Sequence, residues 1–310
     1  MKTSRNNGRV ICLILATVSL GSLLLPSPSD AAALVSPFEA EAERAIASYS
    51  GSPDLKETPE SRGPGEAGKA GKNVRFLGGV VPHHNIALAM IVRFYERVSS
   101  PEVKRVWLFS PDHFRRARKL AAVCDADWKL DTGTLASDKD ACAALDSLAF
   151  AESDAPMFRG EHGITIHIPL IARYFPNACV VPIVLDRNIP DMGLIILRKK
   201  ILELAGPDDV ILLSMDLSHY KTPEAMALED RRTLKVLREM KPLETPTLDV
   251  DARRAAALVL YFFRDMGAKE GKVLERWDSS AVLGHRVESG TSYATVTYEI
   301  INDHGLGNFY

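Results

Sequence analysis

The sequence predicts an α/β fold in which helices cover both faces of a mixed, largely parallel sheet. Short apolar runs alternate with longer amphipathic segments along most of the chain. Several of these runs are apolar at successive positions rather than at every second one, which is typical of strands buried on both faces. Strands and helices that alternate in this way form parallel or mixed sheets between two helical layers.

The N-terminal segment 1–33 is predicted to be a signal peptide. Basic residues up to Arg9 precede an uncharged apolar run at 10–25, and small residues end at Ala33, where we expect cleavage. The protein is therefore expected to be exported, to a periplasmic or extracellular location. An uncleaved anchor carrying the same domain is the open alternative, because the run is only somewhat shorter than a membrane span.

Residues 34–73 predict a short helix, at 38–49, followed by a flexible linker. The linker at 50–73 is rich in glycine and proline and nearly free of apolar side chains. One compact domain is expected at 74–303, with 304–310 as a tail.

The first half of the domain begins with two buried strands joined by a helix. Residues 74–81 are mostly apolar, and 103–109 form a second apolar run. Between them, 86–98 is apolar over a wide arc and charged on the remaining face, which predicts a helix. A short strand pair is expected at 120–124 and 127–132, and a small helix at 139–148.

The second half continues the alternation of helices and strands. Pro176 follows the end of one helix, Gly206 and Pro207 end another, and Thr222 is suited to cap a third. The expected helices lie at 164–174, 192–204, 223–240 and 251–266. The expected strands lie at 178–185, 210–214, 273–277 and 293–301.

The composition excludes several classes of partner. The formal net charge of −2 provides no basic footprint for nucleic acid or for an anionic membrane, so neither is expected beyond the signal segment. No glycine-rich nucleotide-binding motif occurs. After the leader, the cysteines are Cys124, Cys142 and Cys179. Either the first two form one disulfide, or all three are small core residues.

Histidines follow three of the predicted strands. His83 and His84 come directly after the first strand, His113 follows the second, and His219 follows the strand at 210–214. The carboxyl ends of parallel neighbours meet in one crevice, where sites form. Neutral imidazole is a common ligand of iron, copper and zinc. A lone histidine is more often a surface or structural residue, but three in equivalent positions predict a metal site.

Carboxylates lie near these histidines in the sequence. Asp112 precedes His113, and Asp216 lies three residues before His219. Each can accept a ring N–H and fix the tautomer, can itself bind a metal, or can simply stabilise a turn. Asp278, at the end of a later strand, can supply a further oxygen or form a plain turn.

A further candidate pair precedes a helix. Glu161 and His162 stand just before the helix expected at 164–174. His162 and His167 are separated by about 140° around a helix, so they cannot both face one metal. We expect His162 to face the crevice and His167 to be a structural residue at the helix surface. A serine nucleophile is disfavoured, because no serine stands in a GxSxG elbow.

Five motifs occur in order along the chain: Val-Pro-His-His-Asn, Phe-Ser-Pro-Asp-His-Phe, Glu-His-Gly-Ile-Thr-Ile-His-Ile-Pro, Ser-Met-Asp-Leu-Ser-His-Tyr and Ser-Tyr-Ala. Spread over 77–301, they resemble the motifs of the Memo family, called AmmeMemoRadiSam system protein B in bacteria. That family is similar in structure to the class III extradiol dioxygenases, which are non-haem iron enzymes.

The resemblance implies a metal crevice lined by three histidines, of which two are ligands and the third is an acid/base group or a further ligand. It also implies that Glu161 and His162 lie close to the crevice. The candidate metal ligands are His83, His113 and His219. The candidate catalytic residues are His219, His162 and Glu161, and the candidate supporting residues are Asp112, Asp216, Asp278 and His84.

The chain departs from the family in several respects. His84 stands where family members usually have alanine, and is either an added ligand or a bystander. No cysteine occurs at 278–282, where animal members carry one nearby. This favours a site of histidines and carboxylates over a thiolate copper site. The family's frequent radical-SAM partner is cytosolic, so an exported chain is not expected to meet it.

We therefore expect a metal-binding, dioxygenase-like enzyme or redox protein that contains Fe(II) or copper, with zinc also compatible. Its substrate is expected to be a small molecule or a peptide. Two alternatives stay open. A metallohydrolase would use the metal to lower the pKa of water to about 7. A non-catalytic module would keep the crevice and bind a peptide or a protein.

Overall fold

The computed structural model describes residues 34–49 and 74–301. The predicted signal peptide at 1–33, the linker at 50–73 and the tail at 304–310 lie outside the described residues.

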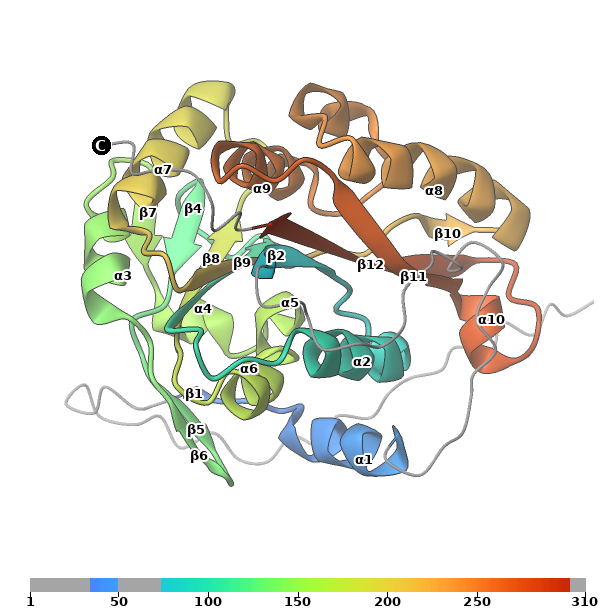
Figure 1. Cartoon of the computed structure of the whole chain (residues 1–310), viewed down its shortest axis with the longest axis horizontal. Coiled ribbons are helices and arrows are strands. Elements are labelled where there is room, and N and C mark those ends of the chain that lie inside the picture. The colour runs from blue at the N-terminus through green and yellow to red at the C-terminus, as the bar shows by residue number, and fades with distance from the viewer. Residues whose placement is uncertain (1–33, 50–73, 302–310) are drawn as a thin grey trace, which may run out of the picture. The chain divides into compact units, whose positions relative to one another are not determined.

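A mixed sheet organises the domain (Figure 1). Among the described residues its strand order is β10-β12-β2-β9-β3-β8-β4-β7, with β11 beside β12. The four central strands are parallel: β2 (Val74–Val81), β9 (Asp209–Ser214), β3 (Arg105–Pro111) and β8 (Cys179–Leu185). On one side, β12 (Gly290–Ile301) is antiparallel to β2, β10 (His219–Lys221) and β11 (Gly271–Asp278). On the other, β4 (Ala121–Val123) is antiparallel to β8 and parallel to β7 (Ala151–Ser153).

Helices cover both faces of the sheet, which confirms the predicted α/β class. In β3, Trp107 and Phe109 lie in one core, and Val106 and Leu108 lie in the other, so the strand is apolar at successive positions. One layer contains α3 (Lys139–Asp146), α7 (Asp191–Leu204), α8 (Pro223–Arg238) and α9 (Arg253–Asp265). The opposite layer contains α1 (Glu39–Tyr49), α2 (Leu88–Val98), α5 (His162–Thr165) and α6 (Ile168–Tyr174). The remaining short helices are η2 (Asn85–Ala87), α4 (Ala155–Phe158), η3 (Pro242–Thr247) and α10 (Ser279–Leu283).

Two local predictions are wrong. The helix expected at 164–174 is divided into α5 and α6, and Pro169 stands in the first turn of α6, where its missing N–H does no harm. The strands expected at 120–124 and 127–132 do not pair with each other. β4 joins the large sheet, whereas β5 (Trp128–Leu130) pairs with β6 (Gly133–Leu135) and β1 (Leu34–Val35).

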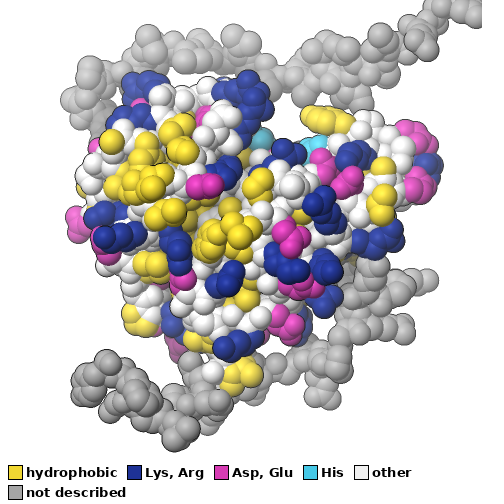
Figure 2. All heavy atoms as spheres, turned by 90° about the horizontal axis from the view of Figure 1, so that it is seen from above, with side chains coloured by type: hydrophobic (Ala, Val, Ile, Leu, Met, Phe, Trp, Pro, Cys, Tyr) yellow, Lys and Arg dark blue, Asp and Glu magenta, His cyan; other side chains and the backbone are white. Residues whose placement is uncertain are grey.

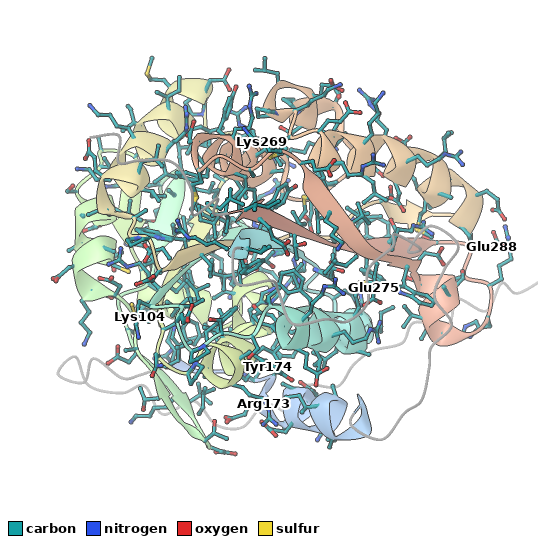
Figure 3. All side chains as sticks on the ribbon, in the orientation of Figure 1. Lys104, Arg173, Tyr174, Lys269, Glu275 and Glu288 are labelled. Carbon is teal, nitrogen blue, oxygen red and sulfur yellow. The ribbon has the colours of Figure 1, made fainter. Side chains whose placement is uncertain are left out.

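Ion pairs hold the outer helices in place. Arg93 of α2 donates to Glu275 of β11 at 2.9 and 2.5 Å, and Glu275 is labelled in Figure 3. Arg173 of α6, also labelled there, pairs with Glu43 of α1 at 3.5 Å. Because Ala42 of α1 also lies in the core shared with α2 and α6, this N-terminal helix packs as part of the domain.

The cysteines of the described region are free thiols. Cys142 and Cys124 do not form the disulfide that the sequence leaves open. The Cys142 thiol instead donates to the Cys124 carbonyl at 3.2 Å. Burial raises the pKa of the Cys124 thiol to about 12, so these side chains act as small core residues.

The outer face formed by α7, α8 and α9 is seen from above in Figure 2. Apolar side chains gather on the α7 side of this face, where Met192, Ile195 and Ile196 are exposed. Within the described ranges, no helix is both long enough and apolar enough to cross a membrane.

Candidate metal centre

The carboxyl ends of three neighbouring strands meet at one point. His83 follows β2 and His113 follows β3, while β9, which lies between these strands in the sheet, leads into Asp216. His83 Nε2 and His113 Nε2 are 3.0 Å apart. The pattern of histidines after strands therefore brings these two imidazoles together, as expected of parallel neighbours.

Two aspartates lie against His83. Asp251, in the loop before α9, places Oδ2 3.0 Å from His83 Nε2 and 3.6 Å from His113 Nε2. Asp216 Oδ2 lies 3.7 Å from the same His83 nitrogen, and Asp216 Oδ1 accepts the backbone N–H of His83 at 3.0 Å. The backbone N–H of Asp216 in turn donates to Asp251 Oδ2 at 3.3 Å. Two imidazole nitrogens and a carboxylate oxygen thus converge. These three residues, together with the adjoining Asp216, Glu161 and His162, are called the cluster.

The spacing of these atoms fits a transition-metal ion. Ligand atoms about 2.1 Å from an ion and at right angles to each other are about 3.0 Å apart, close to the separations among His83, His113 and Asp251. Asp251 Oδ1 is buried and has no hydrogen-bond partner among the described residues, so it remains available to a cation. Two further sets, His83–His113–His162 and His83–Asp216–Asp251, each bring three ligand atoms within 4.8 Å of one another.

Glu161 fixes the orientation of His113. Its Oε1 lies 2.5 Å from His113 Nδ1, and its Oε2 accepts the backbone N–H of His113 at 3.2 Å. Glu161 is buried and also accepts the N–H of Gly163 at the start of α5. A carboxylate beside Nδ1 holds the ring proton there and directs the Nε2 lone pair into the cluster, as is common for metal-bound histidines.

A buried chain of polar side chains supports His83 from the other side. His83 Nδ1 is 2.9 Å from Ser214 Oγ, which is 3.1 Å from His167 Nε2, and His167 Nδ1 is 3.1 Å from the Tyr95 hydroxyl. The expectation that His167 lies at a helix surface is wrong, because residues 163–171 are buried on all sides and its ring lies in the core. Burial lowers the pKa of His167 well below its usual value, so the ring is neutral.

His162 lies on the open side of the cluster. Its ring centroid is 4.0 Å from that of His113 and 5.1 Å from that of His83. Its side chain is 35% exposed, compared with 2% for His83. Burial, followed by the charges of His113 and His83, lowers the pKa of His162 to about 3. As expected from the sequence, His162 rather than His167 adjoins the crevice.

The carboxylates favour positive charge at the centre of the cluster. Burial lowers the pKa of His113, but hydrogen bonds with Asp251 and Glu161 more than offset this and raise it to about 10. Burial also lowers the pKa of His83, and Asp216 and Asp251 raise it to a value above the usual one. Burial raises the pKa of Asp251, but the two imidazoles bring it below its usual range. A divalent cation would supply this positive charge in place of the imidazolium protons.

A glycine allows α5 to lie directly on the end of β3. A Cβ at Gly163 would be 2.1 Å from Ser110 Oγ and 3.1 Å from Cε1 of His113. No side chain fits there, and the close approach brings Glu161 within reach of His113.

Four predicted residues lie outside these ligand groups. His219 belongs to β10, because the chain after β9 turns away to pair with β12, and it is in none of these three sets of ligand atoms. His84 caps η2 through Nδ1. Asp112 and Asp278 accept backbone N–H groups of residues that follow them in the chain. Both therefore stabilise local backbone structure, which is the alternative to a metal-binding role that the sequence leaves open.

Sequence reasoning missed Asp251. The amphipathic pattern places this residue at the start of the helix expected at 251–266, where an acidic side chain is ordinary. The helix begins at Arg253 instead, and Asp251 lies in the loop that faces the histidines. Its only signal is the Asp-Val-Asp sequence at 249–251, which by itself does not indicate a ligand.

Known proteins are similar in sequence to this chain over most of its length. The Memo-like protein family model matches residues 53–297, which include every residue of the cluster. A MEMO1 family protein of Thermotoga petrophila is 25% identical over 225 residues, covering 68% of this chain and 79% of that one. Another, of Ignicoccus hospitalis, is 22% identical over 245 residues, covering 72% of this chain and 86% of its own.

Among solved structures, an uncharacterized protein of Escherichia coli K12 covers 72% of this chain and 99% of its own. Its TM-score of 0.44 and sequence identity of 14% are too low to bear on the site. The family model, by contrast, spans most of the sequence and all of the strand-end motifs. The chain belongs to the Memo family.

Proposed function

We propose that this protein binds Fe(II) through His83, His113 and Asp251 and catalyses an O₂-dependent oxidation of a small organic molecule. The observation that carries the proposal is the convergence of two imidazole nitrogens and one carboxylate oxygen, all within 3.6 Å of one another. This ligand set, with further positions open, is typical of non-haem Fe(II) oxygenases. Bound Fe(II) would supply the one-electron chemistry that O₂ requires.

The donor atoms argue against a Cu(I) site. None of the three sets of potential ligands in the described residues contains a cysteine, so the soft thiolate that selects Cu(I) is not part of the cluster. Zinc accepts imidazole and carboxylate as well. A zinc-dependent hydrolase is therefore the second candidate, favoured by the additional carboxylate of Asp216 beside His83.

The side chains around the ligands have distinct roles. Glu161 and Ser214 contact the Nδ1 atoms of the two histidines, so that both Nε2 atoms face the ion. Asp216 holds the backbone of His83 in place. His162 is the most exposed histidine of the cluster, and it is placed to exchange a proton with a bound substrate.

Metal binding by the full-length protein is the first test. We expect about one Fe(II) per chain after anaerobic reconstitution, and loss of that iron in His83→Ala and in Asp251→Asn. His219→Ala is the matched control and should retain iron, because this histidine lies outside the ligand groups. Fe(II) at a free concentration of 100 times its Kd should raise the free energy of unfolding by about 2.7 kcal/mol. This corresponds to a rise in Tm of about 5–11 °C, which a chelator should reverse.

Four results would contradict this assignment. Unchanged iron content in both ligand variants, or loss of iron in His219→Ala, would show that the ligands are different residues. A stoichiometric preference for zinc, with hydrolysis in the absence of O₂, would replace oxidation by hydrolysis. Failure to bind iron, copper or zinc would indicate a non-catalytic binding protein.

We also propose that the protein acts outside the cytoplasm. The proposal is supported by the basic residues, apolar run and small residues of segment 1–33. A protein at this location would be separated from a cytosolic radical-SAM partner, so no such partnership is proposed.

A further inference from the structure

A cavity adjoins the cluster on the side of Asp251. It has a volume of about 540 Å³ and is lined by residues at the ends of β3 and β8 and by the loop and first turn of α9. This volume is within the range of small-molecule sites. Asp251 belongs both to the lining and to the cluster, where its Oδ2 is 3.0 Å from His83 Nε2. Asp251 thus connects the two, and a molecule in the cavity would approach the proposed metal from the side of Asp251.

The charged lining of this cavity is mainly positive. Three arginines, Arg187, Arg253 and Arg254, accompany one acidic residue, Asp251. His83 and His113 already face the Asp251 carboxylate, so it does little to offset the guanidinium groups. The chain as a whole has a formal charge of −2, so the excess of positive charge is local to the cavity.

The arginines are available to a ligand. Arg187 has no ion pair within the described part of the chain, and Arg253 makes one hydrogen bond, from Nε to the Leu248 carbonyl at 2.5 Å. Arg254 pairs with Asp191, whose side chain is 87% exposed. Because the Asp191 carboxylate is largely in water, an anion in the cavity can replace it at Arg254. Arg254 Nε is buried and has no hydrogen-bond partner among the described residues.

Most of the remaining lining is apolar. Pro111, Leu185 and Val250 contribute to it, and Pro111 is the last residue of β3, two positions before His113. Apolar walls combined with a few charged groups that orient the ligand are characteristic of sites for small organic molecules.

We propose that the substrate of this site is a small organic anion. Its carboxylate or phosphate binds Arg187, Arg253 and Arg254, and its apolar body extends toward the metal ligands. The inference rests on the proposed function, because it names the substrate class of the same site. Planar guanidinium groups suit this role, since they bind carboxylate and phosphate through paired hydrogen bonds.

Binding of three probes to the full-length protein tests the proposal, with and without Fe(II). Benzoate carries a carboxylate, phenyl phosphate carries a phosphate, and benzamide is a neutral analogue of similar shape. By isothermal titration calorimetry we expect at least one anion to bind and benzamide to bind at least tenfold more weakly. The tighter anion identifies the preferred group.

The Arg187→Gln, Arg253→Gln double variant should weaken binding of that anion at least tenfold. Both arginines are exposed, so the fold should persist. Arg264→Gln is the matched control. It lies on α9 but outside the cavity, and it should bind the anion like the unchanged protein.

Iron content is measured on the same samples, so failure of the cavity and failure of the metal site are distinguishable. Weakened anion binding with iron retained in the double variant supports the cavity. Equal binding of benzamide, unchanged anion binding in the double variant, or no probe binding in either state would overturn it. Anion binding that requires Fe(II) and does not depend on the arginines would place the anion on the metal and overturn it as well. Arginine-dependent binding by a protein that takes up no metal would support the anion site and refute the proposed function.

Discussion

At the residue scale, the centre depends on which nitrogen of each imidazole faces the ligand atoms. His113 presents Nε2 because Glu161 occupies its Nδ1, and His83 presents Nε2 because Ser214 occupies its Nδ1. In both cases the residue at Nδ1 belongs to a different segment of the chain from the histidine. Tertiary packing therefore orients both rings, and the effect of a supporting residue can be separated from that of a ligand.

Replacing Glu161 by Gln should weaken Fe(II) binding about 10–100-fold. Glutamine keeps only one of the two acceptor oxygens that His113 and Gly163 use, and it removes the negative charge. Competition with a chromogenic chelator measures the affinity. Glu152→Gln is the control. Glu152 lies on β7, at the edge of the sheet, and accepts the backbone N–H groups of Arg118 and Lys119. An unaltered affinity in Glu161→Gln would mean that packing alone orients His113.

The histidines of the centre are predictable from sequence because each directly follows a strand that an apolar run defines. Asp251 is not, since it precedes a helix, and 35 residues separate it from Asp216, with which it shares a hydrogen bond. His219 shows the converse. Its short separation from β9 in sequence suggests proximity to the crevice, but the chain turns toward the edge of the sheet.

At the element scale, the segment of α5 and α6 is not an amphipathic surface helix. Residues 163–171 are all buried, so His167 lies in the core, where its ring contacts Ser214. Periodicity in the sequence finds the helical and extended segments because that signal is local. It does not give the partners of short strands such as β4 and β5, since strand pairing depends on segments far apart in the chain.

Gly163→Ala should displace the first turn of α5 from β3. The added Cβ would lie 2.1 Å from Ser110 Oγ, and relieving that overlap should cost about 1–3 kcal/mol of stability. Because Glu161 and His162 move with this turn, Fe(II) affinity should fall as well. Urea unfolding and Fe(II) titration measure the two effects. Gly206→Ala is the control, since its Cβ would meet nothing closer than 3.6 Å. If Gly163→Ala were as stable as Gly206→Ala and bound Fe(II) as tightly, the close packing of Gly163 against Ser110 would not be what positions α5.

At the scale of the whole molecule, the centre combines segments from most of the domain. The ligand residues extend from His83 to Asp251 in sequence, and their supports come from the start of α5, from the end of β9 and from the loop that follows β9. Strands β2, β9 and β3 must be in register before these side chains can meet. The centre is therefore a property of the folded domain rather than of any one motif.

The exported protein should begin at Leu34. Intact-mass measurement of the protein from the periplasm or the medium tests this expectation. Leu15→Arg places a charge within the apolar run and should leave the full-length chain in the cytoplasm. An uncleaved chain in the membrane fraction would instead show that the segment is an anchor.

The separation of the ligands along the chain also bears on where the metal is acquired. A chain that crosses a membrane unfolded carries no assembled centre, because His83 and Asp251 meet only once the sheet has formed. Such a chain would take its ion from the pool of the compartment in which it folds. Sites built from imidazole and carboxylate rank divalent metals largely by intrinsic affinity, and metal availability then governs which ion is bound. The supply of ions at the destination would thus help to decide which metal this protein carries.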